Sequence, residues 1–127
     1  MIHPTSIISQ KAKIYKNVKI GPFCIVGDGV EIGEGTELIS NVHIEGNTSI
    51  GSNNVFFPFS AIGLIPQDKK FKGEESFLYI GDNNTFREHV TINPGTKDGG
   101  MKTTIKNNCL IMIGSHIAHD CKIASNV

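Results

Sequence analysis

The sequence predicts an all-β fold, a solenoid of short parallel strands wound into a triangular prism, on three observations. The first is a six-residue period of large apolar residues that runs without a break from Ile2 to Ile62. The second is a mostly small residue four positions after each of them. The third is a glycine that often follows the large residue directly, as in the Ile-Gly pairs at 20–21 and 50–51. Neither the 3.6-residue period of a helix nor the two-residue period of a strand produces an uninterrupted six.

The period assigns a place to each residue type. Three hexads make one coil, and successive coils stack in parallel at about 4.8 Å. The large residue fills the interior, the small one fits inside near a corner, and Gly or Asn takes the turn where a positive φ is needed. The large positions are Ile2, Ile8, Ile14, Ile20, Val26, Ile32, Leu38, Ile44, Ile50, Phe56 and Ile62. The pattern predicts one domain over residues 1–127.

Two interruptions of the period predict loops that project from the prism. The pattern stops after Ile62 and resumes at Ile80, so residues 64–79 or so form a first excursion. A second excursion, at about 93–103, is rich in Gly and Pro, and the period restarts after it one residue out of phase at Ile105. Long loops inserted in a rigid repeat usually carry function. We therefore expect a site near these loops.

Composition excludes several classes of function. The 127 residues carry 12 basic and 12 acidic side chains, which gives no general attraction to nucleic acid or to anionic membranes. No apolar run approaches the roughly 20 residues of a membrane span, and the first residues lack the pattern of a signal peptide. Cys24, Cys109 and Cys121 all fall on the small inward position, so we expect buried thiols rather than ligands or nucleophiles. A soluble, cytoplasmic protein is the expectation.

The stretch "SHIAHD" at 115–120 is the most chemically suggestive part of the chain. In the hexad frame His116 and His119 fall on outward positions, and Asp120 follows near a corner. A neutral imidazole with a carboxylate to hold its tautomer can remove a proton from a hydroxyl group. Two alternatives remain open from the residues alone: surface histidines without a role, or a zinc site with a third ligand such as His89.

Three motifs together carry a family resemblance. "HIAHDC" after a hexad run, "IPQDKKFKGE" in the first excursion and "FREHVTINPGT" before the second are similar to the UDP-N-acetylglucosamine O-acyltransferases. The resemblance implies a left-handed parallel β-helix and the first step of lipid A biosynthesis. In that step a 3-hydroxyacyl group passes from acyl carrier protein to the 3-hydroxyl of UDP-N-acetylglucosamine. It also implies a homotrimer with the active site between neighbouring chains, and it implies no cofactor or metal.

The resemblance also implies roles for single residues in "HIAHDC". His119 matches the general base and Asp120 its orienting partner. His116 matches a second histidine that helps to position the substrate. These assignments come from the motif match and not from the spacing.

Four further candidates lie in or beside the excursions. Gln67 and Asp68 match residues that contact the nucleotide sugar, and Lys70 matches a lysine near the acyl donor and the phosphates. The lysine run around Lys70 is also open to an acidic carrier protein or to solvent alone. Asn93 stands where many family members have histidine; it can form a hydrogen bond to a substrate but cannot be charged, which makes it a weaker candidate.

Other members of the wider hexapeptide-repeat group are alternatives. A glucosamine N-acyltransferase or a CoA-dependent enzyme shares the solenoid, and a metal solenoid like the γ-class carbonic anhydrases, or a solenoid without chemistry, is a third possibility. The N-acyltransferase carries an additional N-terminal domain, whereas hexads here begin at Ile2. The resemblance also leads us to expect an N-terminal fragment that lacks the family's later coils, its oxyanion glycine and its helical domain. We expect such a fragment to be poorly active and prone to aggregate.

Overall fold

The computed structural model describes residues 1–127 as seventeen short strands, and fourteen of these have two residues only. The second residue of such a strand is the large hexad residue, and it points inward while the first points outward. The strands are β1 (Ile7–Ile8), β2 (Lys13–Ile14), β3 (Lys19–Ile20), β4 (Ile25–Val26), β5 (Glu31–Ile32), β6 (Glu37–Leu38), β7 (His43–Ile44), β8 (Asn47–Ile50), β9 (Val55–Phe56), β10 (Ala61–Ile62), β11 (Phe77–Ile80), β12 (Thr85–Phe86), β13 (Thr91–Ile92), β14 (Lys102–Ile105), β15 (Leu110–Ile111), β16 (His116–Ile117) and β17 (Lys122–Ile123).

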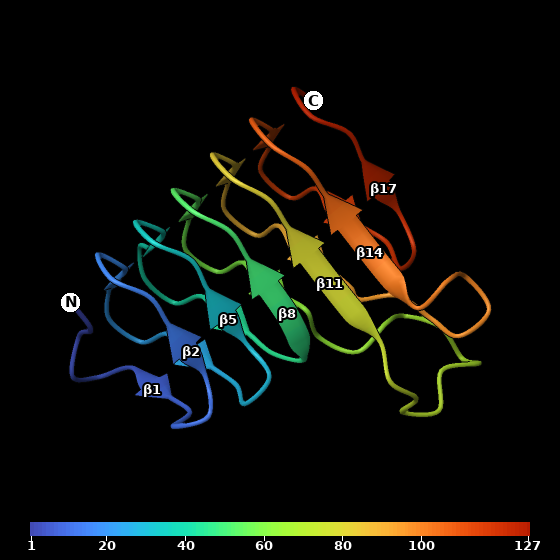
Figure 1. Ribbon diagram of the computed structural model, residues 1–127, viewed down its shortest axis with the longest axis horizontal. Coiled ribbons are helices and arrows are strands. Elements are labelled where there is room, and N and C mark those ends of the chain that lie inside the picture. The colour runs from blue at the N-terminus through green and yellow to red at the C-terminus, as the bar shows by residue number, and fades with distance from the viewer.

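The strands form three parallel sheets that make the faces of a prism. Sheet 1 has the order β1-β4-β7-β10-β13-β16, sheet 2 β2-β5-β8-β11-β14-β17, and sheet 3 β3-β6-β9-β12-β15. Five coils therefore contribute a strand to every sheet, and β16 and β17 belong to a sixth. In Figure 1 sheet 2 faces the viewer and its strands follow one another from the N-terminal to the C-terminal end. This architecture confirms the predicted fold class, a parallel β-solenoid of hexads with two projecting loops.

Apolar hexad residues from successive coils form one core of 21 buried residues along the prism axis. Its largest members are Phe56 and Phe86, whose rings stack with centroids 4.6 Å apart. Packing between coils buries these side chains, so the first coil, which has a neighbour on one side only, is less buried. Ile8 is partly exposed and Ile2 is 45% exposed, against the expectation that every large position lies inside.

Two of the three cysteines occupy the interior as predicted. Cys24 and Cys109 are buried, while Cys121 is only half-buried and packs against the edge of the core. Cys121 is therefore less buried than predicted, because this residue lies in the last coil and has core neighbours on one side only. All three thiols are free.

The turns between sheet 2 and sheet 3, which we call the ladder corner, are held by buried polar side chains. Thr36, Asn54 and Asn84 are at most 1% exposed, and each bonds the backbone of a neighbouring coil. Asn84 donates from Nδ2 to the carbonyl of Lys106 at 2.9 Å, and its Oδ1 accepts from the amide of Cys109 at 2.8 Å. The ladder thus satisfies backbone groups that the corner would otherwise bury unpaired.

The turns between sheet 1 and sheet 2, which we call the loop corner, contain both insertions. Residues 63–76 separate β10 from β11, and residues 93–101 separate β13 from β14. Figure 1 shows the two loops side by side on one edge of the prism. Strands β11 and β14 extend over four residues each and include the last residues of both predicted excursions, because they pair with each other along their whole length. The chain contains no helix that is long and apolar enough to cross a membrane.

Candidate functional site

The "SHIAHD" stretch forms the next turn of the loop corner. His116 lies in β16, directly beside Thr91 of β13, and the chain then turns through His119 and Asp120 into β17. Because coils stack in register, this turn lies one coil beyond the second loop. The hexad period therefore brings the two loops and the histidine turn to one edge, although up to 57 residues separate Gly63 from Asp120.

His119 and Asp120 form a hydrogen-bonded pair. Nδ1 of His119 lies 2.8 Å from Oδ2 of Asp120, and their side chains are 34% and 14% exposed. Adjacent residues can make this contact because Asp120 adopts a left-handed backbone conformation with φ of 68°, which Asp and Asn tolerate better than most residues. The imidazole remains accessible from outside while the carboxylate is mostly enclosed.

The second loop encloses the Asp120 carboxylate. The amide of Thr96 donates to Oδ1 at 2.7 Å, and the Thr96 hydroxyl donates to Oδ2 at 2.5 Å. The backbone amide of Asp120 in turn donates to Oγ1 of Thr103 at 2.9 Å. Thr96 and Thr103 are 5% and 0% exposed, so these bonds are shielded from water.

Opposing effects act on the pKa of Asp120. Burial raises it, but the hydrogen bonds from Thr96 and His119 and the charge of the imidazolium together outweigh burial and hold the pKa below its ordinary value. The carboxyl group is therefore ionised at neutral pH and can only accept hydrogen bonds. It follows that Nδ1 of His119 carries the proton between the pair, so that whenever the imidazole is neutral its Nε2 is the unprotonated nitrogen.

The other histidines are placed apart from this pair. Nδ1 of His116 lies 2.8 Å from Oγ1 of Thr91, and its side chain is exposed on sheet 1. His89 lies in the turn between β12 and β13, at a different corner of the prism, where its ring stacks on Phe59 with centroids 5.4 Å apart. His89 thus cannot complete a zinc site with the other two, and no group of three metal-ligating side chains is gathered anywhere in the chain.

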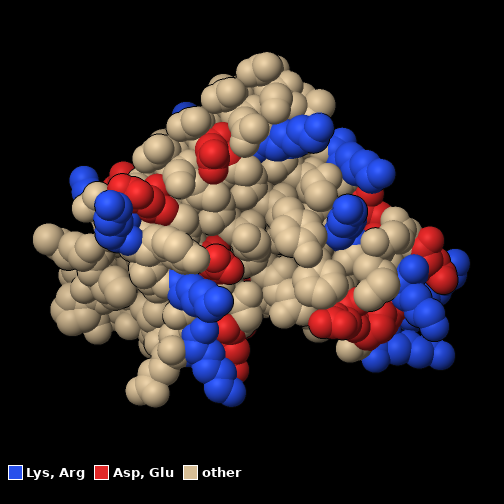
Figure 2. Space-filling view, viewed as in Figure 1, with Lys and Arg blue, Asp and Glu red and all other residues tan.

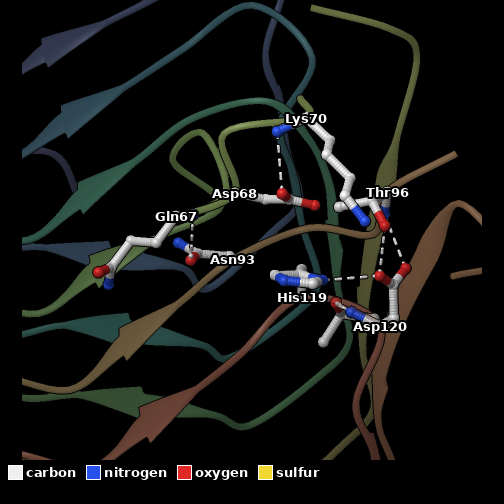
Figure 3. Close-up of polar contacts among 8 residues, drawn as sticks. Gln67, Asp68, Lys70, Asn93, Thr96, His119 and Asp120 are labelled. Atoms are coloured by element: carbon white, nitrogen blue, oxygen red, sulfur yellow. Dashed lines mark hydrogen bonds and ion pairs between the residues drawn. The ribbon is translucent and has the colours of Figure 1, made fainter. Parts of the chain in front are cut away.

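The first loop is braced by Asn93. Its Oδ1 accepts from the amide of Gln67 and its Nδ2 donates to the carbonyl of Leu64, both at 3.3 Å. Asn93 is only 6% exposed, so the structure gives it a role in holding the loop that its side-chain type alone did not suggest. The side chain of Gln67 points away from the pair in Figure 3.

Asp68 and Lys70 form the part of the first loop that faces the pair. Oδ1 of Asp68 accepts from the backbone amide of Lys70 at 2.9 Å, a local turn of the kind that Asp favours. In Figure 3 the Lys70 side chain extends from the first loop in the direction of Thr96. Lys70 is exposed, so its ammonium group is free to move toward an anionic ligand.

The lysine run of the first loop does not form a uniformly basic surface. Figure 2 shows acidic and basic side chains interspersed over the part of the molecule that carries the loops. The amide of Lys72, for example, donates to Oε1 of Glu74 at 2.6 Å. A pocket of about 470 Å³ is bordered by this loop, and its lining includes Glu45, Glu74 and Glu75, a set that repels phosphate groups. None of the predicted site residues lines that pocket.

Sequence reasoning missed Thr96 and Thr103. Thr96 lies within the "NPGT" part of a motif that carried the family resemblance, but nothing in its residue type indicated a contact with Asp120 across 24 positions. Thr103 occupies an inward position of β14, where a threonine also fits as a small core residue. Only the stacking of coils brings the two hydroxyl groups to the same carboxylate turn.

Comparison with known proteins gives an independent view of this architecture. The family model described as "Bacterial transferase hexapeptide (six repeats)" matches residues 5–40. An acyl-[acyl-carrier-protein]–UDP-N-acetylglucosamine O-acyltransferase from Thermodesulfovibrio yellowstonii is 55% identical over 126 residues, which are 99% of this chain and 49% of the relative. The chain spans about half the length of the curated relatives that it matches.

Solved structures agree. A crystal structure of a UDP-N-acetylglucosamine acyltransferase superposes with a TM-score of 0.97 at 50% identity, covering 98% of this chain and 48% of the other. The UDP-N-acetylglucosamine O-acyltransferase of Moraxella catarrhalis superposes with a TM-score of 0.94 at 48% identity, covering 96% and 48%. Over nearly its whole length the chain is therefore similar to the UDP-N-acetylglucosamine O-acyltransferases, and its residues 5–40 match the hexapeptide repeats of bacterial transferases.

Proposed function

We propose that the chain supplies the general base of an enzyme that transfers a 3-hydroxyacyl group from acyl carrier protein to the 3-hydroxyl of UDP-N-acetylglucosamine, the first step of lipid A biosynthesis. The observation that carries the proposal is the His119–Asp120 pair, with a carboxylate enclosed by the second loop and an imidazole exposed on the loop corner. The names of relatives that match nearly all of this chain support the substrates.

The chemistry follows from the free Nε2 of His119. It takes the proton from the sugar hydroxyl as the oxygen attacks the thioester carbonyl, and the imidazolium that forms is stabilised by the Asp120 carboxylate. Collapse of the tetrahedral intermediate breaks the carbon–sulfur bond, and the imidazolium returns the proton to the departing thiolate. The histidine ends neutral, so the cycle requires no cofactor.

Positions of the other candidates are compatible with binding the acceptor at the loop corner. We assign the nucleotide sugar to the first loop, with Gln67 and Asp68 as hydrogen-bonding groups and Lys70 as the cation for its phosphates. His116 lies on sheet 1 in β16, the strand that runs into the turn of the pair, and is assigned to orienting the acceptor. Asn93 acts here through the loop that it braces, with its amide oxygen able to accept a further hydrogen bond.

The pair lies on the outside of one prism, where a second chain can approach. We propose the homotrimer of the family resemblance, in which a neighbouring chain closes the cleft over His119 and shields the reaction from water. Free thiols at Cys24, Cys109 and Cys121 fit a reducing compartment, which supports a cytoplasmic location.

A chimera tests the proposal. Residues 1–127 would replace the matching half of the Thermodesulfovibrio relative, and acyl transfer would be measured with a 3-hydroxyacyl carrier protein and UDP-N-acetylglucosamine. We expect transfer, and we expect His119→Ala to reduce kcat by roughly 10² to 10⁴-fold, as for loss of a general base.

The controls separate this function from its alternatives. His3→Ala removes an exposed histidine in the first coil and should leave kcat unchanged. Acyl-CoA donors and other amino-sugar nucleotides should be poor substrates. Full transfer by the His119→Ala chimera, or a preference for CoA donors, would contradict the proposal.

A further inference from the structure

We propose that Thr96 is a positioning residue, which fixes the Asp120 carboxylate so that His119 is held in the tautomer with its proton on Nδ1. The second loop then contributes to the site, because it supplies the residue that positions Asp120. The inference deepens the proposed function, because it concerns the same histidine base, and it rests on that function for its catalytic consequence.

The contacts of Thr96 engage both carboxylate oxygens at once. Its amide holds Oδ1 and its hydroxyl holds Oδ2, at 2.7 and 2.5 Å. Two donors from one residue prevent the carboxylate from rotating about its χ2 bond, a torsion that is otherwise broad for Asp. Of the two oxygens, only Oδ2 is then also in contact with Nδ1 of His119, at 2.8 Å.

The loop around Thr96 is shaped to make these contacts. A Cβ atom added at Gly99 would overlap the Asp120 carboxylate, so the chain at that point must be glycine to pass over it. The amide of Met101 donates back to the carbonyl of Thr96 at 2.7 Å, and the amide of Gly99 donates to the same carbonyl at 3.2 Å. The loop therefore closes on itself at Thr96 and presents its amide and hydroxyl in one direction.

Burial strengthens the two hydrogen bonds from Thr96 to the Asp120 carboxylate. Thr96 is 5% exposed, and hydrogen bonds to an ionised group are the stronger kind. The hydroxyl proton has no other acceptor among the hydrogen bonds of this residue, so it is directed to the carboxylate. Without it, Asp120 keeps the Thr96 amide but gains freedom to turn Oδ2 away from the imidazole.

The consequence for His119 concerns its neutral form. In water a neutral imidazole exists as two tautomers, and a base must have the nitrogen that faces the substrate unprotonated. A fixed Oδ2 acceptor selects the Nδ1–H tautomer and points Nε2 outward. A mobile carboxylate selects it less completely, so a fraction of the molecules carries the proton on the wrong nitrogen.

The test uses the chimera, in which residues 1–127 are followed by the later coils of the relative, and it requires no acyl transfer. Long-range ¹⁵N–¹H correlation spectra of the histidines distinguish the two neutral tautomers, and His119→Asn assigns the His119 signals. We expect the Nδ1–H form in the unmodified chain, a mixture of both tautomers in Thr96→Val, and the original form again in Thr96→Ser, which keeps the hydroxyl. Thr96→Ala serves the same purpose if the valine variant does not fold.

Thr36→Val is the matched control. Thr36 is also a buried threonine whose hydroxyl bonds the backbone, but it lies in the ladder corner, away from the pair. It should lower the melting temperature without changing the tautomer. A wild-type tautomer in Thr96→Val, or the same mixture in Thr36→Val, would overturn the proposal.

Kinetics in the chimera give the second measurement. Thr96→Val should lower kcat by roughly tenfold with KM within about twofold, because the substrate is not touched, and Thr96→Ser should restore kcat. An unchanged kcat in Thr96→Val would contradict the positioning role. If no chimera transferred acyl groups, the proposed function would fail, whereas the tautomer spectra would still decide the role of Thr96.

Discussion

The ladder corner and the loop corner are built from the same hexads and differ in where their polar side chains point. At the ladder corner every turn keeps the six-residue spacing, and Thr36, Asn54 and Asn84 point inward to bond neighbouring coils. At the loop corner two turns are lengthened, and the polar groups of His119 and Asp120 lie outside the core. One repeating backbone thus carries an edge with inward polar side chains and an edge with outward polar side chains.

The physical reason lies in how a corner satisfies its backbone groups. A regular corner buries amides and carbonyls that a side chain must pair, so asparagine and threonine are committed there to structure. An inserted loop satisfies more of its own backbone and leaves side chains free for other partners. We therefore expect substitutions in the second loop and at the candidate site to affect folding less than substitutions in the ladder.

The largest expected effect is the loss of stability on substituting a buried asparagine of the ladder corner. Asn84→Leu fills a similar volume but leaves the Cys109 amide and the Lys106 carbonyl without their side-chain partners. We expect the free energy of unfolding to fall by about 2–5 kcal/mol, measured by urea denaturation. Asn53→Gly is the control: Asn53 is exposed with φ of 57°, and Gly35 already occupies this position one coil earlier, so the change should be small.

Acyl transfer, in contrast to stability, should be insensitive to the loss of the Asn84 side chain. An Asn84→Leu chimera that remains folded should keep its kcat, because no ladder residue contacts the His119–Asp120 pair. A large loss of kcat per folded molecule would show that the two corners are coupled and that their roles are not separate.

A smaller effect is expected from the glycine that passes over the carboxylate. Gly99→Ala places a methyl group against Asp120 and should reduce kcat of the chimera by roughly tenfold, with a small change in stability. Gly100→Ala is its neighbour control. Gly100 has open space around its Cα but a φ of 109°, so alanine there should cost stability and leave kcat unaffected. The reverse result for the two glycines would contradict the model of the loop.

The smallest effect is a dependence of stability on pH. Because the folded pKa of Asp120 lies below its unfolded value, its ionisation stabilises the fold above the unfolded pKa, and this stabilisation is lost as the pH falls through the folded pKa. Asp120→Asn, which tolerates the same φ, should therefore be less stable than the unmodified chain at pH 7, and the difference should begin to shrink near the unfolded pKa of about 4 and be lost below the folded pKa. A difference in the urea midpoint that persisted unchanged at pH 3 would show that the carboxylate charge is not its cause.

Much of the fold was predictable because it is periodic. The hexad positions from Ile20 to Phe56 were predicted as core and are buried, since each repeats the same contact with the coil before it. Irregular features were predicted less well. Half-burial of Cys121 and the exposure of Ile2 depend on how many coils flank a residue, which a local period does not describe.

At the candidate site, too, local contacts were predictable from the sequence and contacts between coils were not. Motif resemblance and the hexad frame singled out His119 and Asp120, and their contact is between adjacent residues. Asn93 stays a weaker candidate for binding substrate, and the contacts that the structure adds are those that hold the first loop. Its neighbours Leu64 and Gln67 lie in another coil, so neither contact has a signature in the local sequence.

The six-residue period specifies the coil, the inward residues and the outward direction of the two histidines, because each of its positions recurs at the same place in every triangular coil. Tertiary structure alone decided that the second loop returns over the next coil and that Thr96 meets Asp120. The sequence of the second loop is not periodic, so it does not indicate which residues of the next coil the loop will contact. Its contacts are set by the pairing of β14 with β17, which aligns two turns that lie 24 residues apart.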